Sequence, residues 1–577
     1  MNKYRQLYVL TVLLGVIVLD ACKDESSRNN AGLISSNPSE IAAGKTLFEK
    51  NCSGCHQLTQ DGIGPKLSGI TSKLSVEWLR RFIKDPKQLL SSGDNHADSL
   101  FKRYQSVMPA FDFLQDKDVN AIISFLNTSN VTAKSEKDDL LSISNPIREK
   151  INLSDLIVDV KPVIQLPSSI KGNKLPLTRI TKLTYQPDSH NLFVNDLRGE
   201  LYKLKNGKIS VYLDFKKVRP KFIDEPGLAT GFGSFAFHPL FSKNGLLYTT
   251  HTEQPRSGKS DYSYDDSIAV TLQWVLTEWK ISDKNADTLN GTSRELLRLN
   301  MVASAHGMQE ISFNPLAKGG MEDFGLLYIG IGDGASVQLG FPFIAQSKER
   351  IWSSIFRIDP LGNNSMNGQY GIPVNNPFAK QKNKIVHEEI YAFGFRNPHR
   401  LAWTKSAGFL ACNIGQANIE AIDLVEPGRN YGWPVREGNF VFNPYGNLNN
   451  IYSLPSNDSI YKITYPIAEF DHDEGKAISG GYEYQGTAIP ELKGKFLFGD
   501  IPSGRLFYIN AHDIKQGKQA VIKEWRITIN GRSTNLKDQC GSDRVDLHFG
   551  IGPENEIYIL TKADGKVYQL NKATHKK

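Results

Sequence analysis

The sequence predicts two folded domains, a small all-α domain followed by a large all-β domain built as a six-bladed propeller. The chain has 577 residues, which is too long for one ordinary hydrophobic core. Up to about residue 128 the apolar residues recur at helical spacing, whereas beyond Leu175 short apolar strands alternate with turns. One apolar strand pattern recurs six times along the second region, which indicates six blades.

The composition is typical of a soluble globular protein. Charged residues make up 22% of the chain and hydrophobic residues 40%. The formal charge of +7 is spread along the sequence without a basic block, so no nucleic-acid partner is implied. Of the five cysteines, Cys412 and Cys540 form either a disulfide in an oxidising compartment or two buried thiols.

The first 22 residues predict an export signal. Lys3 and Arg5 precede an apolar run over residues 7–19, which is too short and wrongly flanked for a spanning helix. The end of this segment, Ala21-Cys22, resembles a bacterial lipoprotein cleavage box. We therefore expect a lipid on Cys22 that anchors the exported protein to a membrane, on the periplasmic or cell-surface face of a Gram-negative envelope. The alternative is an ordinary cleaved signal in which Cys22 is incidental.

A c-type haem attachment pattern stands near the start of the helical domain, in Asn-Cys-Ser-Gly-Cys-His over residues 51–56. Cys52 and Cys55 are spaced to bond the two vinyl groups of one haem, and His56 directly after them can reach the iron. Met108 supplies a thioether as sixth ligand, which raises the reduction potential and suits an electron carrier. Taken alone, Met108 would be read as a core methionine.

The helical domain is expected over residues 38–128, after a polar tether over residues 23–37. Helical segments are predicted before the haem motif, over residues 76–83 and over residues 116–126. This order of elements resembles a monohaem class I cytochrome c. The resemblance implies one covalent haem c, axial ligation by His56 and Met108, and a partly exposed haem edge.

Residues 129–175 are predicted to be a linker, whose strands can lie along the next domain, and residues 176–572 to be the propeller. An eight-stranded barrel with extra sheets is the alternative fold. The repeated central strands are Leu192–Val194, Leu246–Tyr248, Leu326–Tyr328, Phe409–Ala411, Phe496–Phe498 and Ile557–Ile559. In a propeller, the loops on one face are where sites are built.

Three stretches of the second domain carry candidate chemistry: residues 304–308 (Ser-Ala-His-Gly-Met), residues 391–400 (Tyr-Ala-Phe-Gly-Phe-Arg-Asn-Pro-His-Arg) and residues 426–434 (Glu-Pro-Gly-Arg-Asn-Tyr-Gly-Trp-Pro). Together with residues 235–239 and 330–333 they resemble the glucose/sorbosone dehydrogenase family of soluble quinoprotein sugar dehydrogenases. The likeness covers roughly residues 176–572. It implies a six-bladed propeller that holds pyrroloquinoline quinone (PQQ) beside a calcium ion.

The resemblance places His306 as the base that removes a hydroxyl proton, and Asp333 as the carboxylate that orients it. An imidazole suits this role because its pKa lies near neutrality. The alternative reading of His306 is a hydrogen-bonded structural histidine. Two further residues, His399 and Arg400, are expected to face outwards.

The same resemblance assigns contacts with the cofactor and the calcium ion. Arg396, Asn397 and Gln338 match cofactor contacts, and a fixed cation stabilises the charge that grows on a quinone during reduction. Gly415 and Gln416 match the segment whose backbone carbonyls bind calcium, an ion that prefers oxygen ligands. Arg396 and its neighbours could instead brace a turn.

The chain departs from the family pattern at several positions. Ala229, Ala305 and Pro502 stand where the pattern has polar or charged residues, and the paired arginines become Asp-Arg-Val-Asp over residues 543–546. Arg544 or Arg505 is then the candidate for the missing positive charge. These departures argue against tight quinone binding and against glucose as the substrate, more than they argue against the fold.

Three functions follow from this reading. In the first, a sugar or related alcohol is oxidised on the quinone, and the electrons pass singly through the tethered haem to a downstream acceptor; tethering raises the effective concentration to about millimolar. The second is a propeller that binds a carbohydrate or a partner without quinone, beside an electron-transfer cytochrome. The third is oxidation of a non-sugar alcohol or use of another redox group.

Overall fold

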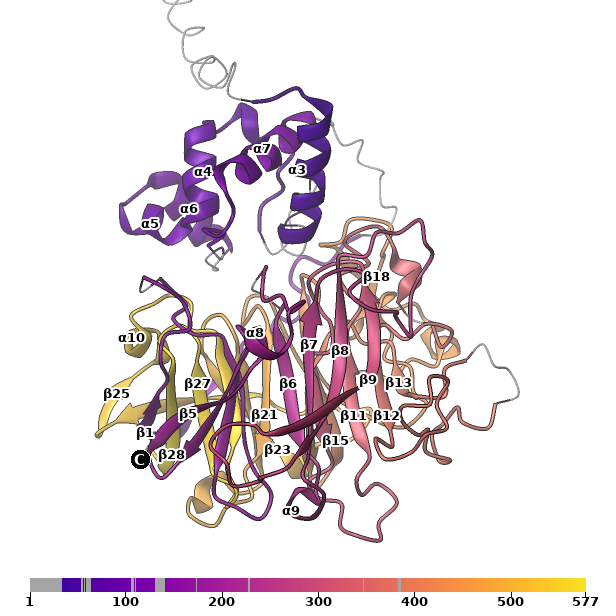
Figure 1. Ribbon diagram of the computed structural model, residues 1–577. Coiled ribbons are helices and arrows are strands. Elements are labelled where there is room, and N and C mark those ends of the chain that lie inside the picture. Colours follow the sequence, from indigo (N-terminus) through magenta and orange to yellow (C-terminus); the bar gives the residue numbers. More distant parts are fainter. Residues whose placement is uncertain are drawn as a thin grey trace, which may run out of the picture. The chain divides into compact units, whose positions relative to one another are not determined.

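The computed structural model describes residues 34–52, 56, 58, 64–104, 108, 110–129, 141–172, 174–226, 229–345, 347–381 and 386–576. The predictions for the export signal over residues 1–22, for Cys22 and for Cys55 lie outside these residues. The chain divides into two compact units, residues 1–137 and residues 138–577. Figure 1 shows that the first is helical and the second is built from strands, as the sequence predicts.

The helical unit has five α-helices and one short 3-10 helix among its described residues. They are α3 (Pro38–Asn51), η1 (Ile70–Ser72), α4 (Val76–Lys84), α5 (Pro86–Ser91), α6 (Asn95–Tyr104) and α7 (Asp116–Thr128). Their ends follow local capping chemistry. The Ser75 side chain accepts a hydrogen bond from Trp78 N at the start of α4, and Gln115 and Asp118 form a capping box at the start of α7.

Helices α3 and α7 approach each other closely at Gly44. A Cβ atom on Gly44 would lie 1.8 Å from the carbonyl oxygen of Ala121, so only glycine allows this contact. The core of the unit is apolar and consists of Phe48, Val76, Leu79, Phe111, Leu114, Val119, Ile122, Ile123 and Leu126. None of the helices in the described ranges is long and apolar enough to span a bilayer.

The second unit contains six antiparallel groups of four strands, the blades of a propeller. In order, they are β2 (Ile180–Tyr185), β3 (Leu192–Asp196), β4 (Glu200–Lys205) and β5 (Lys208–Asp214); β6 (Phe232–Phe237), β7 (Leu246–Glu253), β8 (Leu272–Ile281) and β9 (Gly291–Met301); β10 (Glu310–Phe313), β11 (Leu327–Ile331), β12 (Ser354–Ile358) and β13 (Ile390–Phe393); β14 (Pro398–Thr404), β15 (Gly408–Asn413), β16 (Ile419–Leu424) and β20 (Ala468–Asp471); β21 (Ile478–Glu483), β22 (Lys495–Asp500), β23 (Leu506–Asn510) and β24 (Lys523–Ile529); and β26 (Leu547–Ile551), β27 (Ile557–Thr561), β28 (Lys566–His575) and β1 (Asn152–Gln165).

The first strands of the blades, β2, β6, β10, β14, β21 and β26, contact one another in turn and close a ring. This is the arrangement of a propeller around a central channel, and the barrel alternative is wrong. All six predicted central strands fall on the second strands of the blades, namely β3, β7, β11, β15, β22 and β27.

The ring is closed by β1, which lies within the predicted linker. It pairs antiparallel with β28 and parallel with β24, so it completes the last blade and joins that blade to the one before. Residues 152–165 therefore belong to the propeller. Strands from the linker segment were expected to lie along the next domain, and β1 is such a strand.

The remaining elements are short and lie in the connections. They are α8 (Phe215–Val218), α9 (Phe241–Asn244), α10 (Leu536–Cys540), η2 (Pro342–Ile344), η3 (Asp458–Tyr461), η4 (Pro490–Leu492), η5 (Ala511–Asp513), β17 (Arg436–Glu437), β18 (Phe440–Phe442), β19 (Ile451–Tyr452) and β25 (Arg532–Thr534). Cys412 on β15 and Cys540 in α10 are free thiols, which decides between the two alternatives for this pair.

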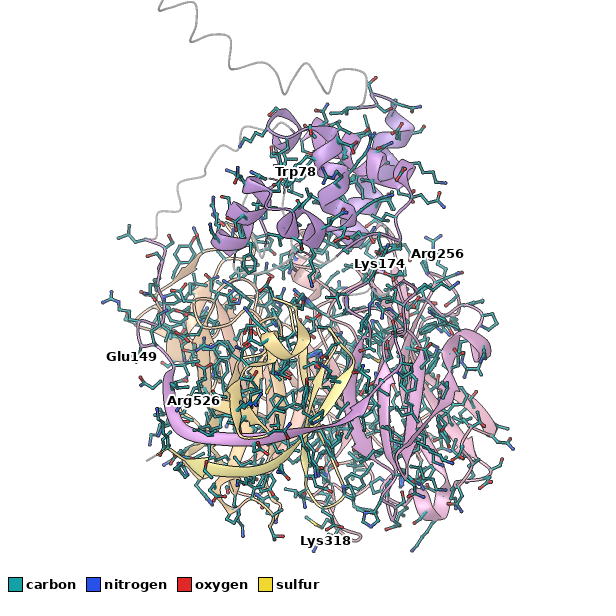
Figure 2. The ribbon with its side chains drawn as sticks, turned by 90° about the vertical axis from the view of Figure 1, so that its left-hand side faces the viewer. Trp78, Glu149, Lys174, Arg256, Lys318 and Arg526 are labelled. Carbon is teal, nitrogen blue, oxygen red and sulfur yellow. The ribbon has the colours of Figure 1, made fainter. Side chains whose placement is uncertain are left out.

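The propeller has two faces with different connections. Because the strands of a blade alternate in direction, the turn between its second and third strands leaves at the same end as the connection to the next blade. Arg256, in the β7–β8 connection, and Lys318, in the β10–β11 turn, lie at opposite ends of the propeller (Figure 2). We call the end with the β7–β8 connection the mouth face.

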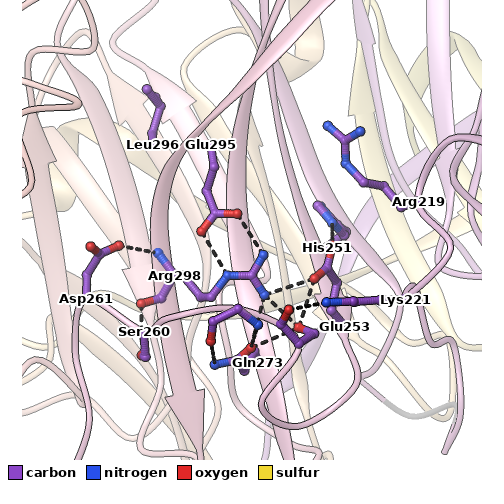
Figure 3. Close-up of polar contacts among 12 residues, drawn as sticks. Arg219, Lys221, His251, Glu253, Ser260, Asp261, Gln273, Glu295, Leu296 and Arg298 are labelled. Carbon is purple, nitrogen blue, oxygen red and sulfur yellow. Dashed lines mark hydrogen bonds and ion pairs between the residues drawn. The ribbon is translucent and has the colours of Figure 1, made fainter.

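A polar network around Arg298 on β9 fixes the β7–β8 connection (Figure 3). The Arg298 guanidinium donates to Glu253 at 2.9 Å, to Glu295 at 2.7 Å and to Gln273 at 3.0 Å. The Arg298 amide donates to Asp261 at 2.8 Å. Each of these groups has its partner within the network, so it stabilises the mouth face and is not itself a site.

Candidate functional site

The haem site predicted in the helical unit has its histidine ready for a metal. His56 Nδ1 lies 2.8 Å from the carbonyl oxygen of Pro65. A carbonyl only accepts, so Nδ1 carries the proton and Nε2 keeps its lone pair for iron. Burial lowers the pKa of His56, although the bond to Pro65 opposes this, and the ring therefore favours its neutral form.

Packing holds the other described haem residues on the same core. Cys52 and Met108 are both partly buried against the apolar core of the helical unit. A Cβ atom on Gly64 would lie 2.4 Å from His56 Cε1, so the chain passes directly over the imidazole edge. The predicted ligands His56 and Met108 and the attachment residue Cys52 thus belong to one small domain.

The residues predicted for the propeller site come together at the mouth face. His306 lies in the β9–β10 connection, Asp333 and Gln338 in the β11–β12 turn, and Arg396 with its neighbour Asn397 in the β13–β14 connection. Gly415 and Gln416 lie in the β15–β16 turn. Every one of these segments is a turn between second and third strands or a connection between blades, so they share one end of the channel.

His306 and Asp333 form a hydrogen-bonded pair. His306 Nδ1 lies 2.7 Å from Asp333 Oδ1, and the carboxylate also accepts from Ala335 N at 2.8 Å and from Trp433 Nε1 at 3.0 Å. His306 has a φ of 51°, in the left-handed region. A Cβ atom on Gly332 would lie 2.5 Å from the His306 carbonyl oxygen, so glycine at this position permits the approach.

Electrostatics keep the His306 imidazole neutral and the Asp333 carboxyl ionised. Burial and the charge of Arg396 lower the pKa of His306, against the opposing effect of Asp333. Burial alone would raise the pKa of Asp333, but its interactions with His306, the charge of Arg396 and the hydrogen bond from the Ala335 amide outweigh burial, and the pKa is lowered. With the proton on Nδ1 directed at Asp333, His306 Nε2 is a free base. The His306 side chain is 13% exposed, so the imidazole has access to the channel.

Arg396 bridges the neighbouring turn. Its guanidinium donates to the carbonyl oxygen of Gly415 at 2.5 Å and to Gln416 Oε1 at 3.0 Å. The side-chain amide of Gln338 lies 2.6 Å from Gln416 Oε1, and with its oxygen turned towards Arg396 it accepts from that guanidinium at 2.8 Å. The predicted cofactor residues Arg396 and Gln338 are therefore adjacent.

The turn with the predicted calcium ligands is held by Glu437, which the sequence analysis did not identify. Glu437 Oε1 accepts from the backbone amides of Gln416, Ala417, Asn418 and Ile419 at 2.8–3.1 Å. The Gly415 carbonyl, expected on calcium, instead accepts from Arg396. Within the described ranges no three His, Cys, Asp or Glu side chains are grouped to hold a metal ion.

Two of the predicted cationic residues are engaged in ion pairs. Arg544 Nε lies 2.8 Å from Asp546 Oδ1, just before β26. Arg505 is paired with Glu474 at 2.8 Å and with Glu524 at 2.7 Å, which directs its charge into the protein. Asn397 is buried, and its backbone amide donates to Asn413. Arg544 thus stays the candidate cofactor residue, whereas Arg505, in the β22–β23 turn of the same face, is held by two carboxylates and has a structural role.

His399 and Arg400 were expected to face outwards, and this expectation is wrong. Both are 6% exposed, because they lie on β14, the first strand of its blade, and this strand lines the channel. Arg400 donates to the Thr181 carbonyl at 2.6 Å and pairs with Glu310 at 3.2 Å. The position of these polar residues on a first strand was the signal that could have identified them.

A histidine pair stands in the same channel. The rings of His399 and His548, on β14 and β26, lie 5.6 Å apart. Three of the ring nitrogens have no hydrogen-bond partner among the residues that the structure describes. They are both nitrogens of His399 and Nε2 of His548. Burial lowers the pKa of both, and the positive charges of Arg400 and Lys562 lower it further. The channel therefore presents unsatisfied polar groups and positive charge.

A small helical domain with a haem attachment motif, followed by a propeller with a histidine–carboxylate pair at its mouth, defines a cytochrome-linked protein of the dehydrogenase-propeller class. Residues 177–569 match the model of the glucose/sorbosone dehydrogenase family, and residues 41–130 match that of cytochrome c. The chain belongs to the glucose/sorbosone dehydrogenase family and carries a cytochrome c domain before the propeller.

Several characterised or named proteins are similar to the propeller part. The chain is 28% identical over 383 residues to HIPL1 protein of Arabidopsis thaliana, covering 59% of this chain and 53% of the relative. It is 24% identical to quinoprotein glucose dehydrogenase B of Acinetobacter calcoaceticus, covering 62% and 74%. The chain spans about half the length of HIPL1 and of mouse Hedgehog-interacting protein. A crystal structure of glucose dehydrogenase aligns with a TM-score of 0.51 and 18% identity, covering 71% of this chain and 99% of that one, which shows the shared fold.

Proposed function

We propose that the propeller oxidises a sugar or related alcohol on a bound quinone, and that the attached haem c receives the electrons. The observation that carries the proposal is the His306–Asp333 pair, a neutral imidazole with its free Nε2 at the mouth of the channel beside Arg396. The family membership of the chain and its cytochrome c domain support the same class of function.

The residues of the mouth fit an anionic quinone such as PQQ. Arg396 and Lys562 bring positive charge to the channel, and the unpartnered nitrogens of His399 and His548 are polar atoms that a ligand or water would satisfy. Arg396, Gln338 and Arg544 would contact the cofactor, with Asn397 bracing the turn beside Arg396. When bound, the quinone would supply an acceptor for the two electrons that leave the substrate carbon.

The protein side of the reaction is proton removal. A substrate hydroxyl placed at His306 Nε2 would transfer its proton to the imidazole as the carbon is oxidised. Asp333 keeps the other proton on Nδ1 and stabilises the imidazolium that forms, while Trp433 and Ala335 hold the carboxylate in place. Arg396 disfavours a proton on His306 before the substrate arrives.

The helical unit would hold the haem through Cys52 and Cys55, with His56 and Met108 as axial ligands. The Pro65 carbonyl already fixes the tautomer of His56, so Nε2 would be available to the iron without a change of tautomer. A haem bound there would supply one-electron transfer to a downstream acceptor. Calcium remains part of the proposal as a partner of the quinone at the turn of Gly415 and Gln416.

The proposal is tested with purified holoprotein, PQQ, and a panel of aldoses and alcohols, with and without calcium. Substrate-dependent bleaching of a soluble redox dye is expected only when PQQ is present, and it is expected to fall by at least a hundredfold in His306→Ala. PQQ-independent turnover, or full turnover in His306→Ala, would contradict the assignment. Omitting calcium decides whether that ion takes part.

A binding protein without quinone is the second candidate. Asp546 stands in the segment where the family pattern has paired arginines, and it neutralises Arg544 by an ion pair. The chain is also 25% identical to Hedgehog-interacting protein of Mus musculus over 411 residues, a relative named for binding a protein. If this candidate is right, PQQ does not bind, and a carbohydrate or protein ligand binds without being oxidised.

We also propose that the protein is exported and held at a membrane by a lipid on Cys22, on the periplasmic or cell-surface face of a Gram-negative envelope. The support is the signal-like segment that ends at Ala21-Cys22. Cell fractionation of the wild type and of Cys22→Ala tests it. A membrane-bound wild type and a released variant are expected, whereas equal release of both would refute the anchor.

A further inference from the structure

Lys562 is a buried cation at the mouth of the channel. It follows β27 directly, in the turn between the second and third strands of the last blade, and is 9% exposed. Its backbone is fixed by a bond from Lys562 N to the Asp546 carbonyl at 3.3 Å and by Thr178, whose amide and hydroxyl both donate to the Lys562 carbonyl. Position and burial are therefore set by the fold.

The Lys562 ammonium group has no hydrogen-bond or ion-pair partner among the residues that the structure describes. Asp546 is the acidic group whose charge acts on it, and that carboxylate is paired with Arg544 at 2.8 Å. A largely buried lysine whose ammonium has no close counter-ion is costly, whereas pairing of the ammonium with an anion recovers that cost.

The other groups that face Lys562 come from three blades, and among them the cations outnumber the anions. They are Asp546 and Arg544 before β26, His548 on β26, His399 and Arg400 on β14, and Arg179 before β2. Burial and the charges of Arg400, Arg544 and Arg179 together lower the pKa of Lys562 to about 8, against the opposing effect of Asp546. Positive charge thus exceeds negative charge at this point of the channel.

The site adjoins the base of the proposed reaction. Lys562 and His306 both lie close enough to His399 to lower its pKa, and neither ring nitrogen of His399 has a hydrogen-bond partner among the described residues. The Lys562 ammonium, the histidine pair and His306 therefore belong to the same end of the channel. A ligand that pairs with the Lys562 ammonium must carry a negatively charged group. Both the quinone cofactor and sugar acids carry such a group in the form of a carboxylate.

We propose that Lys562 binds a carboxylate of the ligand in the channel, and that this carboxylate belongs to the quinone cofactor. Lys562 thereby supplies, from the last blade, positive charge that the sequence lacks at Pro502 and in residues 543–546. The choice of the quinone as the ligand rests on the proposed function. The choice of a carboxylate rests on the Lys562 ammonium, which has no ion-pair partner among the described residues.

Affinity measurements test the site without turnover. The dissociation constant of PQQ is measured by equilibrium dialysis for the wild type, Lys562→Met and Lys562→Arg, at pH 7 and pH 9. We expect Lys562→Met to weaken binding at least tenfold at pH 7, and Lys562→Arg to bind within about threefold of the wild type because it keeps the charge.

The pH dependence identifies the ammonium group as the ligand. With a pKa of about 8, the protonated fraction of Lys562 falls about tenfold between pH 7 and pH 9, so the wild-type affinity should fall by up to about tenfold. Both variants should show no such change, since neither side chain titrates in this range and burial keeps His399 and His548 neutral throughout it. Lys572→Met, in an exposed lysine of β28, is the matched control and should behave as the wild type.

Binding by Lys562→Met within twofold of the wild type, or a wild-type affinity that does not change from pH 7 to pH 9, would overturn the site. If PQQ does not bind the wild type at millimolar concentration, the proposed function fails, and a hexuronate decides the remaining question. A hexuronate that binds the wild type and not Lys562→Met moves the carboxylate site to an acidic sugar. A hexuronate that binds neither overturns the inference.

Discussion

Asp333 sets the tautomer of His306, and Asp333→Asn removes this role while keeping the size of the side chain. In the wild type, Asp333 Oδ1 accepts from His306 Nδ1 and Ala335 N, and Oδ2 accepts from Trp433 Nε1. In the variant one of these oxygens becomes an NH₂ group that must face a donor. If it replaces Oδ2, it meets the indole N–H of Trp433; if it replaces Oδ1, it meets the Ala335 amide and donates to His306 Nδ1.

The magnitude follows from these contacts. A buried donor left without an acceptor costs about 1–3 kcal/mol, so the variant should unfold at a lower temperature. In the second orientation His306 carries its proton on Nε2, where the substrate proton must be accepted, and general-base catalysis worth about 10²–10⁴-fold is lost. We expect kcat for the preferred substrate to fall by about 10²–10⁴-fold, with a smaller change in the affinity for PQQ.

The assay compares dye-linked turnover of PQQ-loaded wild type, Asp333→Asn and Asp423→Asn, with thermal unfolding measured in parallel. Asp423 on β16 is also buried and its pKa is raised by burial to about 8, so an isosteric amide there replaces a largely protonated acid and should keep activity within about twofold. A folded Asp333→Asn that retained a third or more of wild-type kcat would refute the role given to this pair.

Three further changes test other parts of the structure. Gly44→Ala should lower the thermal stability of the helical unit by about 1–3 kcal/mol, because its Cβ would lie 1.8 Å from Ala121 O; the Soret absorbance on heating reports this, and unchanged melting would be inconsistent with the close approach. Gly64→Ala should shift the haem spectrum and its midpoint potential, since the new methyl group overlaps His56 Cε1 at 2.4 Å; an unaltered redox titration would speak against the placement of that loop. The raised pKa of Asp423 means that the folded state holds its proton up to about pH 8, so Asp423 contributes stability that is lost as pH rises through the window between its unfolded pKa and about 8, by up to about 1.4 kcal/mol per pH unit. Urea titrations from pH 6.5 to 8 should show this slope in the wild type and a smaller one in Asp423→Asn; equal slopes would refute the assignment.

The six blades were predictable because each central strand is a short apolar run between turn residues, a pattern that depends only on local sequence. Strand β1 could be expected only as a linker strand without a fixed place, because its partners β28 and β24 lie hundreds of residues away and local sequence does not identify them. The closure of the ring also determines which polar residues are buried. For this reason His399 and Arg400 were assigned to the surface, although both lie on a strand that lines the channel.

Part of the site could be predicted from its motifs, and part depended on tertiary contacts. His306, Asp333 and Arg396 stand in short stretches with glycine and proline, which the family resemblance places in the site. Glu437 and Lys562 have no motif of their own. Glu437 is recognised because four backbone amides of a neighbouring turn converge on its carboxylate. Lys562 is recognised because folding buries it without an ion-pair partner among the described residues.

The most direct test of the whole account is the visible spectrum of the haem in PQQ-loaded holoprotein after a substrate identified by the dye assay is added. The account predicts that the haem becomes reduced, that reduction requires both PQQ and substrate, and that it is lost in His306→Ala while dithionite still reduces the haem of that variant. A haem that stays oxidised while the propeller turns over with the dye would contradict electron transfer from the propeller to the haem.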